Sequence, residues 1–91
     1  MFPPDKRPQR LERLSGRDVG DEYLFYDGDS DSVHVLNGTA REIYLLCDGT
    51  RSVDKLVAAM LERYEIDETT AREDVDSTLR RLIDLGMLSV S

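Results

Sequence analysis

The stretch V-H-V-L-N-G-T-A-R-E-I-Y-L-L-C-D-G, residues 33–49, changes its hydrophobic period halfway along, and the rest of the chain is organised around this change. Val33 and Val35 alternate with His34, which is typical of a half-buried strand. Apolar residues then recur at the spacing of one helix face, at Ala40, Ile43, Tyr44 and Cys47. The stretch therefore predicts a strand that leads directly into a helix.

The residues at both ends of this predicted helix favour a start and a stop. Asn37 and Thr39 can each accept a hydrogen bond from the first amides of a helix. Gly49 favours the left-handed backbone that commonly ends a helix. We therefore expect the strand over residues 32–36 and the helix over residues 39–48.

The sequence before this stretch predicts a second strand. In E-Y-L-F-Y-D, residues 22–27, Tyr23 and Phe25 would lie on one face and Leu24 and Tyr26 on the other. The turn-forming residues 27–31 would join this strand to the strand over 32–36 as a hairpin. A short first strand is expected over residues 10–14, and residues 15–21 are rich in turn formers.

Two more helices are predicted after Gly49. Ser52 is expected to cap a helix over residues 53–64, and a third helix begins at Glu68 or Thr69 and runs to about Leu85. The core stripe of the third helix contains Ala71, Val75, Leu79, Leu82 and Gly86, which fall within roughly 80° on a helical wheel, and Gly86 ends the helix. Residues 87–90 are expected to add a short closing strand. The predicted fold class is α+β and winged-helix-like, with a two- or three-stranded antiparallel sheet at the N-terminal end followed by three helices.

Composition indicates one soluble domain. The chain has 91 residues and a net charge of −7, which disfavours a nucleic-acid backbone or an anionic membrane as the main partner. Three prolines within residues 1–9 indicate a flexible N-terminal arm, so the domain is placed at residues 10–91. A single cysteine and the lack of any long apolar run favour the cytoplasm, without a secretion signal or membrane span.

No catalytic or metal-binding constellation is expected. His34 is the only histidine and has no base partner or nucleophile at a recognisable spacing, so we expect it to face solvent or a groove. Cys47 lies on the apolar face of its predicted helix, as a packing residue would. Asp27, Asp29 and Asp31 begin like a calcium loop, but the glycine and the glutamate that complete such a loop are missing. We therefore predict no enzyme activity and no cofactor.

A family resemblance appears in the central stretch. The pattern L-N-x-T-A-x-x-I-x-x-L-x-D-G, from Leu36 to Gly49, is similar to the PqqD-like family, and T-x-S-x-x-x-L-V at 50–57, E-D-V at 73–75 and G-M-L at 86–88 continue it. These are small domains that hold the leader peptides of ribosomally made, post-translationally modified peptides. Family members often have tryptophan at the position of Tyr44, and this chain has none.

The resemblance implies a mode of binding. In such domains the leader peptide adds as an extra strand to the sheet edge and lies in a groove against the third helix. Carried over to this chain, the edge would be formed by the main chain of Ser32, Val33, His34 and Val35. The helix wall would come from Asp74, Val75, Thr78, Arg81, Leu82 and Leu85, and which flank of the helix faces the peptide stays open.

The implied function is a non-catalytic binding module that presents a precursor peptide to a separate modifying enzyme, in this family often a radical SAM enzyme. Two alternatives stay open, a winged-helix DNA-binding or regulatory domain and a general protein-interaction adaptor. Acidic residues outnumber arginines on the third helix, which disfavours nucleic acid. The module is expected to be a monomer or a homodimer.

Overall fold

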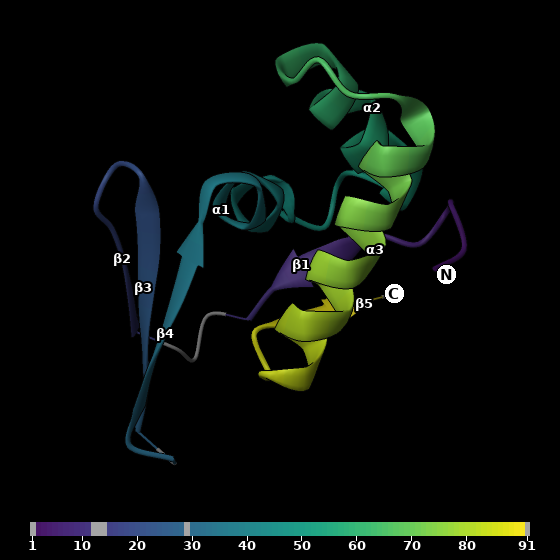
Figure 1. Cartoon of the computed structure of the whole chain (residues 1–91). Coiled ribbons are helices and arrows are strands. Elements are labelled where there is room, and N and C mark those ends of the chain that lie inside the picture. The colour runs from purple at the N-terminus through teal and green to yellow at the C-terminus, as the bar shows by residue number, and fades with distance from the viewer. Residues whose placement is uncertain (1, 12–14, 29, 91) are drawn as a thin grey trace.

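The structure is a computed structural model that describes residues 2–11, 15–28 and 30–90. Its elements form a three-stranded antiparallel sheet, three helices and a small two-stranded sheet. They are β1 (Pro8–Arg10), β2 (Ser15–Asp18), β3 (Glu22–Asp27), β4 (Ser32–Asn37), α1 (Gly38–Leu46), α2 (Val53–Arg63), α3 (Glu68–Asp84) and β5 (Leu88–Val90). In Figure 1 the sheet β2-β3-β4 forms one layer and the helices lie to one side of it. The predicted α+β class, with strands before three helices, is confirmed.

The predicted hairpin of β3 and β4 is confirmed. In β4, however, the residues that face the core are not the two valines, as expected, but the residues that alternate with them. Leu36 is fully buried and His34 is half-buried, whereas Val33 is 63% exposed. His34 is the cross-strand partner of the buried Phe25, and cross-strand partners in an antiparallel pair share a face. His34 therefore lies on the inner face of the sheet, and the two valines lie on the outer face.

Two strands differ from the sequence expectation. The first strand, expected over 10–14, is observed at Pro8–Arg10, where it pairs with β5, and residues 12–14 lie outside the described part of the chain. Residues 15–18, expected to be turn, form β2 because they pair with β3. Neither segment has the alternating apolar pattern of a strand: β1 pairs with a partner at the far end of the chain, and β2 pairs with β3, which follows it after a short turn. The expected closing strand is confirmed as β5.

The second and third helices begin at side-chain caps. Ser52 accepts a hydrogen bond from the amide of Lys55 at 3.3 Å and caps α2, as predicted. Asp67 accepts from the amide of Thr70 at 2.7 Å and caps α3. The first helix ends at Leu46 rather than at residue 48, and Gly49, with φ of 84°, then turns the chain toward α2.

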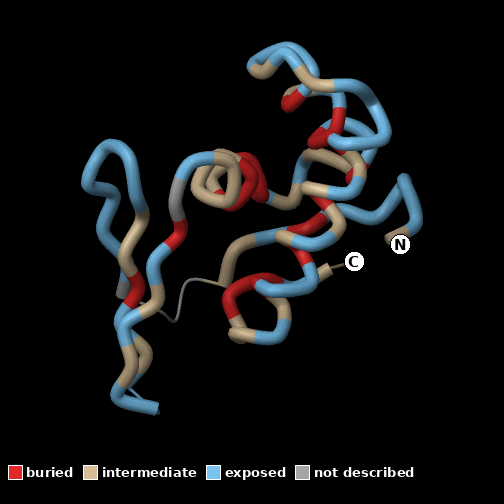
Figure 2. Tube along the Cα trace, in the orientation of Figure 1, coloured by how far each residue is buried: buried red, intermediate tan, exposed pale blue. Residues whose placement is uncertain are grey.

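The core lies between the inner face of the sheet and the three helices. Four of the five predicted stripe residues, Ala71, Val75, Leu79 and Leu82, are 0% exposed and pack in the core with Phe25, Leu36, Ile43 and Leu56. The fifth, Gly86, lies beyond the end of α3 and is partly exposed. Phe25 and Tyr44 meet edge to face with ring centroids 4.8 Å apart. Figure 2 shows buried positions on the facing sides of the helices, whereas the part of the β3–β4 hairpin nearest its turn has none. That part of β4 is therefore free of the core.

The N-terminal segment before β1 lies against α2 and α3. The amides of Val53 and Asp54, at the start of α2, donate to the carbonyls of Lys6 and Pro4 at 2.8 and 3.1 Å. The amide of Phe2 donates to Asp76 on α3 at 3.0 Å. The bonds to Val53 and Asp54 satisfy amides that the first turn of α2 cannot bond internally. The separation of a flexible arm over 1–9 from a domain over 10–91 stays a prediction.

Candidate functional site

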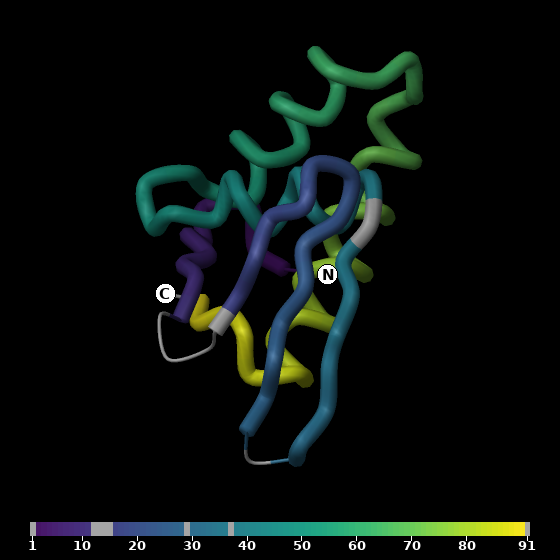
Figure 3. Tube along the Cα trace, turned by 90° about the vertical axis from the view of Figure 1, so that its left-hand side faces the viewer, coloured from purple at the N-terminus to yellow at the C-terminus, as the bar shows by residue number. Residues whose placement is uncertain are grey.

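The edge of the three-stranded sheet formed by β4 is open. The strand order β2-β3-β4 leaves β4 paired with β3 on one side only. Figure 3, turned by 90° from Figure 1, shows β4 at the margin of the sheet with α3 behind it. An edge strand presents N–H and C=O groups that another extended chain can pair with.

The main-chain groups of β4 alternate between β3 and this open edge. The amide of Val19 donates to the carbonyl of Glu22 at 2.9 Å, so the main chain of Glu22 faces β2. Bonding direction alternates along an antiparallel strand, so every second residue of β3 faces β2 and the residues between them face β4. The residues of β3 that face β4 pair with Ser32, His34 and Leu36. The main chain of Val33 and Val35 therefore points outward.

A side chain from α3 reaches the same edge. Nη2 of Arg81 donates to the carbonyl oxygen of Val35 at 3.2 Å. This contact agrees with the outward direction that the ladder gives for Val35. It also places one flank of α3 beside β4.

The two flanks of α3 have different neighbours. Asp76 accepts from the amide of Phe2, and the guanidinium of Arg80 lies 5.9 Å from the centroid of the Phe2 ring, so their flank faces the N-terminal segment. At about 100° per residue, the flank of Arg81 also carries Asp74, Thr78 and Leu85. The contacts of Arg81 and Asp76 therefore place one flank of α3 beside β4 and the other beside the N-terminal segment.

The structure brings only part of the predicted site to the surface. Val33, Val35 and Arg81 are exposed, and Asp74, Thr78 and Leu85 are partly exposed. Val75 and Leu82 are 0% exposed, so they pack in the core behind the exposed flank of α3 and are not accessible at the surface. Ser32 and His34 direct their main-chain groups to β3. The outward-facing main chain is thus limited to alternate residues, a detail that the sequence alone did not reveal.

The outer face of the sheet is apolar beside this edge. Cross-strand pairs place Leu24 opposite Val35 and Tyr26 opposite Val33, and all four side chains share this face. Tyr26 is 50% exposed, and its hydroxyl donates to Asp31 at 2.8 Å. A shallow hollow of about 370 Å³ lies over Arg17, Leu24 and Val33. Side chains of an added strand would find apolar neighbours on this face.

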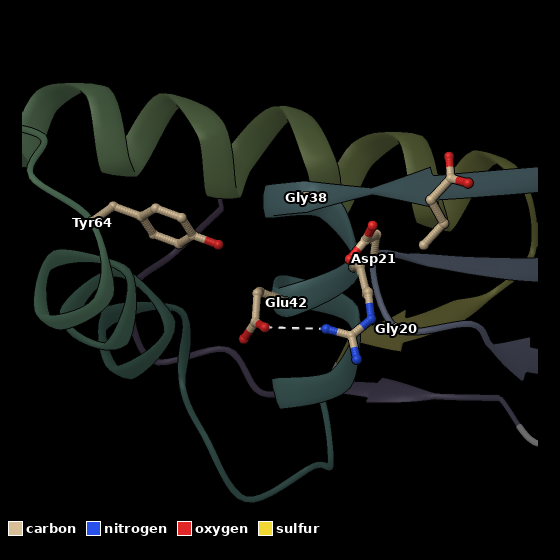
Figure 4. Close-up of a pocket in the computed structure, with 7 residues that line it drawn as sticks. Gly20, Asp21, Gly38, Glu42 and Tyr64 are labelled. Carbon is tan, nitrogen blue, oxygen red and sulfur yellow. Dashed lines mark hydrogen bonds and ion pairs between the residues drawn. The ribbon is translucent and has the colours of Figure 1, made fainter.

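A second hollow, of about 540 Å³, lies where the β2–β3 turn, α1 and the end of α2 meet. Figure 4 shows Glu42 and Tyr64 on its helical side and Asp21 on the side of the sheet. Arg41 pairs with Asp18 at 2.6 Å and with Glu42 at 3.2 Å, and Glu42 also pairs with Arg63. The hydrogen bond from Arg41 holds the pKa of Asp18 below its ordinary value. This network of ion pairs, which the sequence did not predict, ties α1 to the turn and to α2.

The one cysteine is inert. Cys47 is 0% exposed, and its thiol donates to the carbonyl of Ile43 at 3.0 Å. Burial raises the pKa of Cys47 to about 12, so the thiolate that acts as a nucleophile is scarce at neutral pH. Nearby, the guanidinium of Arg10 donates to the carbonyl of Leu45 at 2.5 Å and closes the end of α1. This corner of the molecule is structural.

Among the residues that the structure describes, no three His, Cys, Asp or Glu side chains are grouped so that they could hold a metal ion. Over the same ranges, each helix is too short or too polar to cross a membrane. The chemistry that the site offers is main-chain hydrogen bonding at β4 and side-chain contact with one flank of α3.

Comparisons with known proteins agree with this geometry. A solved structure of TbiB1 in complex with the TbiA(beta) leader peptide has a TM-score of 0.78 at 18% identity, over 89% of this chain and 94% of that one. A lasso peptide synthetase B1 complexed with the leader peptide also has a TM-score of 0.78, at 22% identity, over 91% of this chain and 98% of that one. A search of curated proteins found no match. The family model for coenzyme PQQ synthesis protein D matches residues 22–88, which include β3, β4, the three helices and the start of β5, and the chain therefore belongs to the PqqD family.

Proposed function

We propose that this domain captures the leader of a ribosomally made precursor peptide by strand addition to β4 beside α3. The observation that carries the proposal is the open edge of β4, where the main-chain groups of Val33 and Val35 point away from β3. Membership of the PqqD family supports it. Two proteins of similar fold have been solved with a leader peptide, which supports it further.

Strand addition suits a partner that varies in sequence. The peptide main chain satisfies the outward groups of β4 whatever its side chains are. Alternate side chains of the peptide would then face the flank of α3 that carries Thr78 and Arg81, or the apolar outer face beside Val33. Affinity comes from the main chain, and selectivity comes from these two faces.

In this proposal the domain does no chemistry itself. A separate modifying enzyme, of which a radical SAM enzyme is one class, would act on the core of the precursor peptide while the domain holds the leader. Holding the leader raises the effective concentration of the core at that enzyme. The domain needs no cofactor for this role.

The charges on α3 give no support to a DNA-binding role. Arg72 pairs with Asp54 and Glu68, and Arg80 pairs with Asp76. Paired arginines leave little positive surface for phosphates, and the chain as a whole carries a net charge of −7. A salt titration separates the two functions, because DNA binding weakens steeply with salt whereas main-chain pairing changes little.

The test is an NMR titration of labelled protein with the leader segment of a short precursor peptide encoded beside the gene. We expect affinity in the micromolar range, about −8 kcal/mol, with shifts at Val33, Val35 and the Arg81 flank of α3. Val35→Pro removes the outward amide without removing a bond to β3, so binding should fall at least tenfold in folded protein. The matched control, Val35→Thr, keeps the amide and the branched shape and should bind like wild type. Unchanged binding by folded Val35→Pro and Val33→Pro variants would rule out strand addition at this edge.

A further inference from the structure

Arg81 differs from the other two arginines of α3 in its partner. Arg72 and Arg80 each pair with carboxylates at 2.9 Å. Arg81 donates only to the carbonyl of Val35, and within the described ranges no carboxylate pairs with it. A guanidinium has five N–H donors in a fork that fits a carboxylate, so one carbonyl leaves most of this capacity unused.

The carbonyl that Arg81 contacts is one that an added strand would use. The main chain of Val35 points to the open edge, so the amide of a paired peptide residue would take this acceptor. The guanidinium would then lie against the added strand with its donors available. Cross-strand partners share a face, so the peptide residue paired with Val35 would direct its side chain to the outer face. Side chains alternate along a strand, so the peptide residues on either side of it would face Arg81.

The charge of this flank changes sign along α3. Asp74 precedes Arg81 by seven residues, about 10 Å along the helix axis, and no cation pairs with it among the residues described. Figure 1 shows α3 running antiparallel to β4, so the C-terminal half of α3, to which Arg81 belongs, lies nearer the hairpin turn than the N-terminal half, to which Asp74 belongs. A negatively charged side chain of the peptide is therefore attracted to this flank of α3 only at the end nearer the hairpin turn.

We infer that the bound peptide carries an aspartate or a glutamate that Arg81 recognises, next to the residue paired with Val35 and on the side that faces α3. This inference rests on the proposed function and names the class of peptide that the site selects. The attraction is local, since a net charge of −7 repels an acidic peptide at longer range.

The test is a selection from a displayed library of random 12-residue peptides on three proteins. Wild type should enrich an acidic residue at one position, and Arg81→Glu should enrich lysine or arginine at that same position. The matched control is Arg80→Glu, the adjacent exposed residue on the other flank, which should keep the acidic preference. For one selected peptide, replacing its acidic residue by the neutral amide should weaken binding to wild type about tenfold and leave binding to Arg81→Gln nearly unchanged.

The outcomes separate this inference from the function on which it rests. Selected peptides that shift the amides of Val33 and Val35 but show no acidic preference, or the same preference on Arg81→Glu, would overturn the role of Arg81 and leave strand addition standing. If no selected peptide shifts those two amides, strand addition fails and the inference fails with it. Arg81 is exposed, so the variants should fold, which circular dichroism verifies.

Discussion

Gly16 shows how one residue lets β2 join the sheet. A Cβ at this position would lie 2.3 Å from Cε1 of Tyr23, closer than non-bonded carbon atoms approach. The ring of Tyr23 has little room to move, because it stacks on Phe25 with centroids 4.6 Å apart and lies 5.2 Å from Tyr44. The missing side chain therefore lets the ring of Tyr23 cover β2.

We expect Gly16→Ala to lower the free energy of unfolding by about 1–3 kcal/mol, because the ring must leave its packed position. The measurement is urea denaturation followed by circular dichroism. Gly28→Ala is the control, since a Cβ there would meet only the Tyr26 ring at 3.8 Å and should change stability little. Equal stability of the two variants would mean that the ring of Tyr23 moves freely.

At the scale of elements, the link between α1 and α2 is held by one carboxylate. Asp48 accepts from the amide of Thr50 at 2.9 Å and from its hydroxyl at 2.6 Å, and it pairs with Arg51 at 2.8 Å. The hydrogen bonds from Thr50 lower the pKa of Asp48 to about 2. A lowered pKa means that the ionised form stabilises the fold, so this stabilisation is present above the ordinary value of 3.8 and is lost as pH falls toward 2.

Asp48→Asn should therefore reduce the loss of stability between pH 4 and pH 2, with stability at pH 7 lower than that of wild type. Thermal unfolding over that pH range measures it. Glu73→Gln makes the same change of charge at an exposed site on α3 and should leave the acid dependence as it is. If Asp48→Asn and wild type lose stability in parallel, the carboxylate does not hold the link.

Elements with a strong local signal were predictable, and those whose own residues carry no strand or helix pattern were not. The stripe of α3 and the cap at Ser52 follow from spacing and residue type, and both were correct. The sequence S-G-R-D of β2 has no such signal, and it becomes a strand only because β3 lies beside it. The phase of β4 was wrong for a related reason, since valine at alternate positions marks a strand but not the face that the helices cover.

The candidate site could be predicted from the sequence only to the level of the elements. The family pattern points to β4 and α3, whereas the flank of α3 that lies beside β4 is identified by the contact of Arg81 with Val35, 46 residues away in sequence. Val75 and Leu82 are buried although both were assigned to the groove, because a helical stripe identifies a side of the helix and not the depth of each residue. The network around Arg41 had no sequence signal, since its partners come from separate elements.

At the scale of the whole molecule, the N-terminal segment before β1 is hydrogen-bonded to two helices, α2 and α3. Its carbonyls at Pro4 and Lys6 accept from the first amides of α2, and Phe2 packs against the core and lies near Arg80. Without the segment these amides lose their protein acceptors.

Deleting residues 2–6 should lower the free energy of unfolding by about 2 kcal/mol and speed hydrogen exchange at the amides of Val53 and Asp54. Phe2→Ala is the matched control, since it removes the ring but keeps both carbonyls and should leave exchange at these amides slow. Rapid exchange of both amides in the intact protein would mean that residues 1–9 are a flexible arm, as the prolines predict.

The pairing of β1 with β5 has a consequence for how this domain can be joined to other chains. Pro8 and Val90 are cross-strand neighbours, so the first and last strands of the fold lie side by side. The segment leading into β1 runs along the flank of α3 opposite Arg81, away from the free edge of β4. A domain with adjacent entry and exit tolerates insertion into a surface loop of a larger protein. This fold is therefore suited either to stand alone or to be inserted into a longer polypeptide, with the free edge of β4 accessible in both arrangements.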